Sequence, residues 1–200
     1  MTNNSQIKCD IMRSSTKIFT PFHRSLHWAI AILMTVLFIT GFLRMNWMGK
    51  KAILGAIEKN MHGVDLTKEQ TIGTVKSILN PMWQWHEYAA FIFFVIIVVR
   101  IIYMLVKGIR FPNPFSANTS ANEKFQGFIY LLFYLFVIVS SITGAYLKWW
   151  DGDLKDAMET IHKWAIYWFP IFIILHFGGI WLAEKVAQKG IASKMIGGDD

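Results

Sequence analysis

The chain has 200 residues, of which 54% are apolar and only 16% charged, whereas a soluble protein carries roughly 25% charged residues. This balance excludes a disordered protein, and the single cysteine, Cys9, excludes a disulfide-stapled secreted domain, covalent c-type haem and cysteine-based zinc or iron–sulfur sites. The net charge of +7 does not indicate that the protein binds nucleic acid, because the basic residues lie between long apolar runs. Anionic lipid headgroups are the expected counter-charge at such positions.

Four apolar stretches are long enough to cross a bilayer, which takes about 20 mostly apolar residues. A backbone that spans a membrane must satisfy its own hydrogen bonds, so runs of this length are predicted to be helices. We therefore predict an all-α integral membrane protein, a four-transmembrane-helix bundle that forms a single membrane domain over residues 1–200. The predicted spans lie at about 25–45, 84–107, 124–147 and 162–184.

The segment before the first span is too long and polar for a signal peptide, so we expect the first span to remain in the mature protein. Eleven of the Lys and Arg residues lie on the side of the two termini and nine on the other side. By the positive-inside rule, this excess places both termini in the cytoplasm. We expect a multi-pass protein of the bacterial cytoplasmic (inner) membrane, in contact with lipid.

The first loop, residues 44–82, is the largest segment outside the predicted spans. Its apolar residues between 52 and 57 have helical spacing, and Asn80-Pro81 is expected to close the loop. Two interpretations stay open for this segment. It is either a surface helix or a docking surface for a partner subunit.

Histidine is the ionisable residue that recurs in and beside the spans, at positions 23, 27, 86, 162 and 176. Ionisable residues in a membrane are costly and mark function by default, although a lone histidine is also compatible with ordinary hydrogen-bonded packing. His162 and His176 are 14 residues apart on the fourth span. On one helix that spacing places them roughly 21 Å apart and within about 40° of the same face.

The antiparallel order of the spans predicts which histidines lie at the same depth. His27 opens the first span at the inner surface, level with His176, and His86 opens the second span at the outer surface, level with His162. Each of these two pairs is suited to hold a flat metal macrocycle, because neutral imidazole is a normal axial ligand of haem iron. Zinc fits less well, since it takes four ligands and no acidic or thiol group joins either pair.

These residues also carry a resemblance to a known family, the prokaryotic cytochrome b561 / Ni-hydrogenase b-type cytochromes. That family includes the membrane cytochrome b subunits of respiratory formate dehydrogenases and hydrogenases. The tail, from Glu184 to Gly198, is similar to the cytoplasmic end of those members. The likeness covers nearly the whole chain and rests on His27-Trp28, His86, His162, His176, Thr40-Gly41 and Thr143-Gly144.

The resemblance implies that the bundle holds two non-covalent b haems and carries electrons between a partner subunit and the membrane quinone pool. The partner would be an iron–sulfur or catalytic oxidoreductase subunit, and the chain would be the electron-transfer subunit of a respiratory enzyme of the formate dehydrogenase or hydrogenase type. The resemblance also places the quinone site beside the inner haem, near His27 and His176.

Two other functions stay open at this point. A stand-alone cytochrome b561 would oxidise a small reductant such as superoxide and would need no partner subunit. A haem-free transporter or membrane anchor is the other class, but transporters often show internal repeats and broken helices, and the sequence has neither clearly.

Four further residues near the histidines have two interpretations each. His23 lies one turn before His27 and is the alternative ligand, although the deeper His27 is preferred. Arg100 is 14 residues after His86 and either faces a haem propionate or quinone carbonyl or extends to the inner headgroups. Gly41 and Gly144 either let helices pack closely or leave room for a porphyrin. His62, in the first loop, is expected to be solvated.

Overall fold

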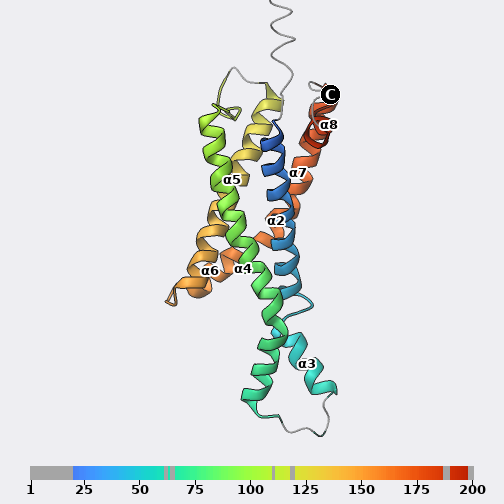
Figure 1. Cartoon of the computed structure of the whole chain (residues 1–200), viewed down its shortest axis with the longest axis vertical. Helices are drawn as coiled ribbons and strands as arrows, with labels where there is room; N and C mark the ends of the chain where they lie inside the picture. Colours follow the sequence, from blue (N-terminus) through green and yellow to red (C-terminus); the bar gives the residue numbers. More distant parts are fainter. Residues whose placement is uncertain are drawn as a thin grey trace, which may run out of the picture.

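The structure, a computed structural model, describes residues 20–60, 63, 66–109, 111–117, 120–186 and 190–197. Within this part of the chain every regular element is an α-helix (Figure 1). In chain order the helices are α2 (Pro21–Met45), α3 (Lys50–Asn60), α4 (Lys68–Val106), α5 (Ala121–Trp149), α6 (Lys155–Lys163), α7 (Ala165–Val186) and α8 (Ile191–Ile196).

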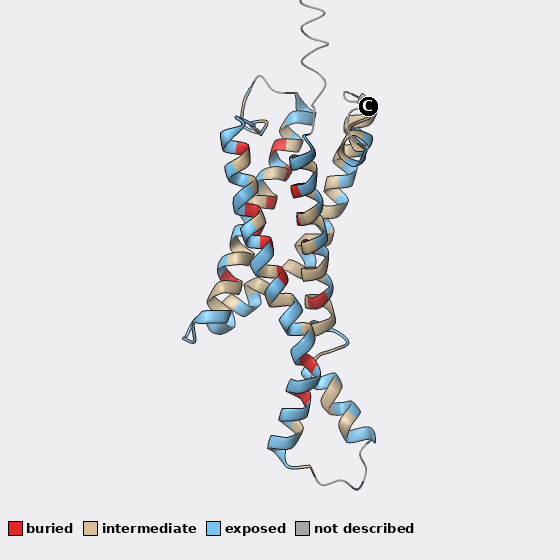
Figure 2. Cartoon of the chain, in the orientation of Figure 1, coloured by how far each residue is buried: buried red, intermediate tan, exposed pale blue. Residues whose placement is uncertain are grey.

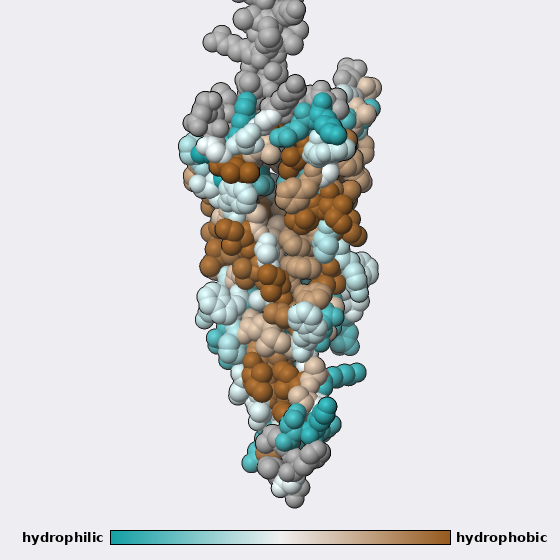
Figure 3. Space-filling view, turned by 90° about the vertical axis from the view of Figure 1, so that its right-hand side faces the viewer, coloured by the Kyte–Doolittle hydropathy of each residue, from teal (hydrophilic) through white to brown (hydrophobic). Residues whose placement is uncertain are grey.

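Four segments of the described chain are long and apolar enough to cross a membrane, which confirms the predicted all-α membrane bundle. They are Pro21–Met45, Lys68–Val106, Ala121–Trp149 and Lys155–Lys185. The apolar residues along their outer faces contact lipid. Figure 3 shows these apolar side chains along the body of the molecule and hydrophilic side chains gathered toward its two ends.

The four spans pack so that α2 lies against α4 and α7, while α5 lies against α6 and α7. A cluster of buried apolar residues holds them together in the middle of the bundle (Figure 2). On α2, α4 and α5 two buried members lie four residues, about one turn, apart, so each of these helices turns an apolar stripe to the centre, and partly buried residues of α7 pack against them. The buried members are Ile30, Met34, Phe93, Ile97, Phe133 and Val137.

Helix α4 begins much earlier than the predicted second span. Thr67 and Gln70 form a capping box in which the Thr67 hydroxyl accepts from the Gln70 N–H at 3.2 Å and the Gln70 side chain accepts from the Thr67 N–H at 2.9 Å. The helix then continues through Pro81. The expectation that Asn80-Pro81 closes the loop was therefore wrong, because the cap upstream supplies a helix start that the proline does not interrupt.

A helical hairpin, defined here as α3 together with residues 68–82 of α4, projects beyond the bundle (Figure 1). Val75 and Leu79 are buried in it, and α3 packs against α4. The helix predicted around residues 52–57 is thus present within α3. His62, expected to be solvated, lies outside the described residues.

The fourth span is not one continuous helix, contrary to the expectation that His162 and His176 share one. Helix α6 ends at Lys163 and α7 begins at Ala165, with Trp164 between them. At this break the Trp164 N–H donates to the Ile161 carbonyl at 3.1 Å, so the bond spans three residues and not four. The tighter turn at this bond ends α6 before α7 begins.

The two ends of the bundle differ, and we name them by what they carry. The start of α2 and the short helix α8 lie at one end, called the terminal end, and the hairpin projects from the other, called the hairpin end (Figure 1). Helix α8 is fixed at the terminal end by two bonds. The Trp28 indole N–H donates to the Met195 carbonyl at 3.4 Å, and the Ala192 N–H donates to the Glu184 carboxylate at 3.0 Å.

Candidate functional site

Four of the predicted site residues come together as two imidazole pairs. His27 on α2 and His176 on α7 form the terminal pair, with ring centroids 6.1 Å apart. His86 on α4 and His162 on α6 form the hairpin pair, with ring centroids 6.3 Å apart. Each pair joins helices that are far apart in the sequence, so it forms only when the bundle does.

The apolar core separates the two pairs. Along α2, Ile30 and Met34 follow His27 toward the hairpin end, and along α7, Phe169 and Phe172 precede His176. Phe172 stacks on the ring of His176 with a centroid distance of 5.5 Å. A dry, aromatic-rich layer therefore lies between one imidazole pair and the other.

The hairpin pair is held by two threonines that are the only buried polar residues of the described chain, Thr40 at 9% and Thr143 at 3% exposure. Thr40 Oγ1 lies 2.8 Å from His86 Nδ1, and Thr143 Oγ1 lies 3.1 Å from His162 Nδ1. Both belong to an Ile-Thr-Gly triplet that occurs twice in the sequence, as Ile39-Thr40-Gly41 and Ile142-Thr143-Gly144, near the ends of the first and third predicted spans. The sequence showed the repeated triplet but gave no reason to connect its hydroxyls to the histidines.

Other groups fix the surroundings of the hairpin pair. The indole of Trp83 stacks on His86 at a centroid distance of 5.1 Å, with the two planes 3° from parallel. Beside it, the Lys148 ammonium on α5 contacts the Glu87 carboxylate on α4 at 2.6 Å. This ion pair, which the sequence did not reveal, ties α4 to α5 at the depth of His86.

The terminal pair is held differently, by ring contacts. His27 lies edge-on to Trp28 at a centroid distance of 6.0 Å. Within the described residues no hydrogen bond to either imidazole of this pair is found. His23, the alternative to His27, has its ring 6.2 Å from Tyr103 of α4, so it faces another helix than the one that carries His176.

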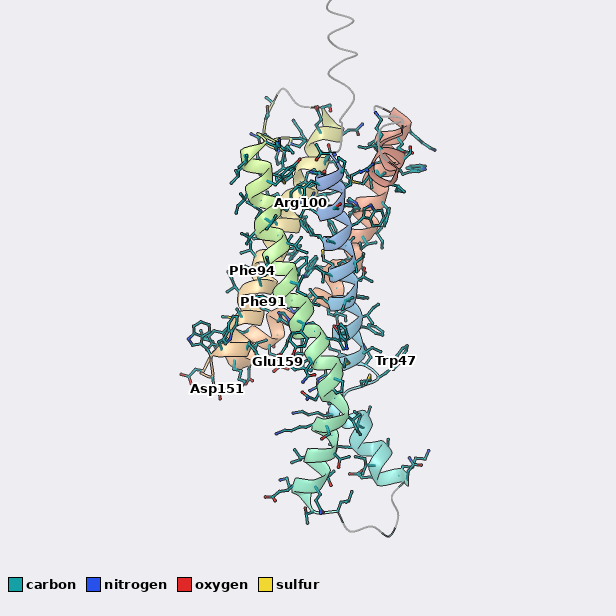
Figure 4. The ribbon with its side chains drawn as sticks, in the orientation of Figure 1. Trp47, Phe91, Phe94, Arg100, Asp151 and Glu159 are labelled. Carbon is teal, nitrogen blue, oxygen red and sulfur yellow. The ribbon has the colours of Figure 1, made fainter. Side chains whose placement is uncertain are left out.

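Two arginines lie near the terminal pair. Arg100 on α4 lies within electrostatic reach of His27, His176 and His23, and Figure 4 places it in the part of the bundle away from the hairpin. The predicted depth of Arg100 therefore agrees with the structure.

Arg24 lies one turn before His27, and its Nη1 atom is buried with no hydrogen-bond partner in the described part of the chain. A buried guanidinium nitrogen without a partner is costly and fits a site for an anionic group.

The two glycines of the Ile-Thr-Gly triplets have different surroundings. A Cβ atom added to Gly144 would lie 3.0 Å from Cε1 of His162. At Gly41 such an atom would meet nothing within 4 Å. Gly144 thus leaves room for a histidine ring, whereas the space beside Gly41 is open.

These residues fit haem better than a free metal ion. With metal–nitrogen bonds of about 2.0 Å, two imidazoles on opposite sides of one iron have ring centroids about 6 Å apart, which matches both pairs. No group of three or more His, Cys, Asp or Glu side chains suited to a metal ion occurs among the described residues. The unpartnered Arg24 nitrogen adds a counter-charge for a propionate.

A family model described as prokaryotic cytochrome b561 matches residues 18–198 of the chain. The matched region contains every described helix, both imidazole pairs, Arg24 and Arg100. Among curated proteins and solved structures, none matches the chain.

Proposed function

The chain belongs to the prokaryotic cytochrome b561 family, whose members are membrane haem proteins of electron transfer, and we propose that it holds two b haems and carries electrons between a partner oxidoreductase subunit and the membrane quinone pool. The observation that carries the proposal is the presence of two imidazole pairs, at opposite ends of one bundle, each spaced to hold one iron. We further propose that the whole chain, residues 1–200, is one such cytochrome domain.

Four histidines are proposed as the axial ligands, paired as His27 with His176 and His86 with His162. Bound haem supplies a centre that takes up and releases one electron at a time. The imidazoles fix the position of each centre, and the buried core between the pairs excludes water from both. The guanidinium groups of Arg24 and Arg100 would neutralise propionate charge at the terminal end.

The quinone is proposed to bind at the terminal end, on the cytoplasmic side of the inner membrane, with both termini on that side. Arg100 supports this assignment because a cation near His27 and His176 is able to donate to a quinone carbonyl. Arg100 therefore has two proposed partners, the haem propionate and the quinone, and with either partner its guanidinium is part of the binding site at the terminal end. The competing role is a side chain that extends to the lipid headgroups, which the Arg100→Leu variant separates from the other two.

The partner subunit is proposed to dock at the hairpin end. The hairpin projects from the bundle (Figure 1), and its α4 segment ends four residues before His86. Beside it, the large aromatic residues Trp47 and Trp85 are 73% and 69% exposed, and Trp and Tyr are typical of both interfaces and membrane boundaries. An electron donor bound there would lie closest to the hairpin pair.

Haem content tests the proposal directly. Because each imidazole pair offers two axial nitrogens, the purified protein should contain two b haems per chain, both low-spin and six-coordinate when oxidised and when reduced. Pyridine haemochrome analysis measures the number, and absorption spectra report the spin state. A haem-free protein would indicate a transporter or an anchor, and a single haem or a high-spin site would refute the paired ligation.

Purification under mild conditions tests the partner. A subunit of a respiratory oxidoreductase should retain a second protein with its own redox centre, and deletion of α3 (Lys50–Asn60) should release that protein while both haems stay bound. If the chain purifies alone and reduces quinone with superoxide as the electron donor, the stand-alone function is correct and the docking role of the hairpin is wrong.

Gly144→Ala is expected to disturb the hairpin pair without unfolding the bundle. The added methyl would press on the His162 ring at 3.0 Å, so the ring must move by a few tenths of an ångström. We expect weaker haem binding at this pair alone, measured as a loss of about one haem on dilution. Gly73→Ala is the matched control, because nothing lies within 4 Å of a Cβ atom there. An unchanged haem affinity in Gly144→Ala would show that His162 is not held in place by this contact.

A further inference from the structure

We propose that Thr40 and Thr143 are positioning residues that fix the tautomer of His86 and His162 and thereby lower the midpoint potential of the hairpin haem. The inference rests on the proposed function, because it concerns an iron bound by these two imidazoles. It assigns a role to two hydroxyl groups that neither axial ligation nor helix packing requires.

The direction of each hydrogen bond follows from counting protons. A threonine hydroxyl has one proton, and Thr40 Oγ1 lies 2.7 Å from the Val36 carbonyl of its own helix, which is able only to accept. The hydroxyl proton is therefore used there, and the bond of 2.8 Å to His86 must be donated by the Nδ1–H of the imidazole. With the ring proton on Nδ1, the lone pair of His86 is on Nε2 and free for a metal.

The same arrangement recurs at the other ligand of the pair, with one addition. Thr143 Oγ1 lies 2.8 Å from the Val139 carbonyl and 3.1 Å from His162 Nδ1. His162 Nδ1 is also 3.1 Å from the Ser140 carbonyl, an atom that accepts and never donates. The Nδ1 atom of His162 must therefore carry the proton, which again leaves Nε2 for the metal.

These bonds have an electronic consequence for the bound iron. An imidazole whose Nδ1–H donates to an oxygen is a stronger electron donor through Nε2 and stabilises the more oxidised, more positive metal. Both ligands of the hairpin pair have such a bond. In the described chain no corresponding bond occurs at the terminal pair, which instead lies near the positive charge of Arg100.

The competing explanation is ordinary back-bonding, in which a threonine in a membrane helix donates to the carbonyl four residues earlier. Thr35 on the same helix provides the control, because its hydroxyl makes that bond to the Ala31 carbonyl at 2.8 Å and has no hydrogen bond to a histidine among the described residues. Thr35→Val and Thr40→Val therefore remove the same local bond from α2. Only Thr40→Val also removes an acceptor from a proposed ligand.

The test is a redox titration of the purified full-length protein with both haems bound. Each haem gives one reduction step in the titration, and the step of the hairpin haem is the one that is lost in His86→Ala. Thr40→Val should move this step to higher potential while the terminal step stays in place, and Thr40→Ser should restore the original value. Thr143→Val should move it in the same direction but less, because His162 keeps the Ser140 carbonyl as an acceptor.

The outcomes separate this inference from the proposed function. A hairpin step that does not move in Thr40→Val, or moves no more than in Thr35→Val, overturns the inference while the haems remain. If Thr40→Val loses the hairpin haem alone and Thr40→Ser keeps it, the positioning role is supported. If Thr40→Val does not assemble, Thr143→Val and Thr143→Ser decide, and equal potentials in those two variants overturn the inference. A wild-type protein without haem overturns the proposed function itself.

Discussion

Replacing either member of one imidazole pair with alanine is expected to remove the same haem. His86→Ala and His162→Ala should each lose the haem at the hairpin end, and His27→Ala and His176→Ala should each lose the one at the terminal end. The haem content of each variant should fall from two per chain to about one, since a non-covalent b haem depends on its axial ligands. Haem analysis and low-temperature absorption spectra measure both the loss and which of the two signals disappears.

Double variants test the proposed pairing of the ligands more stringently. His86→Ala combined with His162→Ala should resemble either single change, because the two side chains act on one site, whereas His86→Ala combined with His176→Ala should remove both haems. The imidazole planes provide a second assignment, since they are 79° apart in the hairpin pair and 38° apart in the terminal pair. Ferric low-spin signals in electron paramagnetic resonance depend on this angle and should differ between the two sites.

His23→Ala is the control for the terminal pair. The His23 ring faces Tyr103 and not His176, so this variant should keep both haems. If His23→Ala loses the terminal haem while His27→Ala keeps it, His23 is the ligand. If His27→Ala and His162→Ala lose the same haem, the pairing by depth is wrong.

The pairing by depth was available from the sequence because it needs only two facts, the number of spans and their alternating direction. His27 and His176 must then lie near one surface, and His86 and His162 near the other. The same reasoning placed Arg100 at the level of His27. Depth along a straight span is set by residue count and rise per residue, and both are read directly from the chain.

Features that depend on local capping or on side-chain partners could not be predicted from the sequence. The start of α4 at Lys68 depends on a capping box inside a polar loop, and the break at Trp164 depends on a hydrogen bond to the Ile161 carbonyl, three residues earlier. The Thr40 and Thr143 hydroxyls lie close to histidines that are 46 and 19 residues away in sequence. No periodicity in the chain encodes such a contact, and only the packed bundle brings the groups together.

The two ends of the bundle also differ in the electrostatic groups that surround the imidazoles. At the hairpin end the imidazoles donate to neutral oxygens, and the nearby ion pair of Glu87 with Lys148 adds no net charge. At the terminal end the guanidinium of Arg100 acts electrostatically on both imidazoles of the pair. A cation favours the reduced, less positive iron, so Arg100 should raise the midpoint potential of the terminal haem.

Arg100→Leu is expected to lower the midpoint potential of the terminal haem and to slow quinone turnover, with both haems retained. Leucine keeps an apolar body, so the span should still insert, and insertion should become easier because an arginine inside a span is costly, up to about 2.5–3.5 kcal/mol at the centre. The loss of a charge-assisted hydrogen bond to a quinone carbonyl costs about 1.5–3 kcal/mol, which corresponds to a decrease of roughly 10- to 150-fold in quinone turnover. Redox titration and quinol-coupled electron transfer measure the two effects separately.

Arg100→Lys and a matched surface variant decide what the guanidinium does. Lysine restores the positive charge but not the planar guanidinium with its fixed pair of N–H donors. Since the potential depends on the charge and the quinone contact on the donors, Arg100→Lys should recover the midpoint potential more fully than the quinone turnover. Arg44→Leu is the control, because it removes an arginine from the last turn of α2 at the hairpin end, far from the terminal pair. If Arg100→Leu leaves both the potential and the turnover at their original values, the side chain extends to the headgroups and belongs to neither binding site. If the potential falls while the turnover stays constant, Arg100 acts on the haem alone and the quinone binds elsewhere on the terminal end.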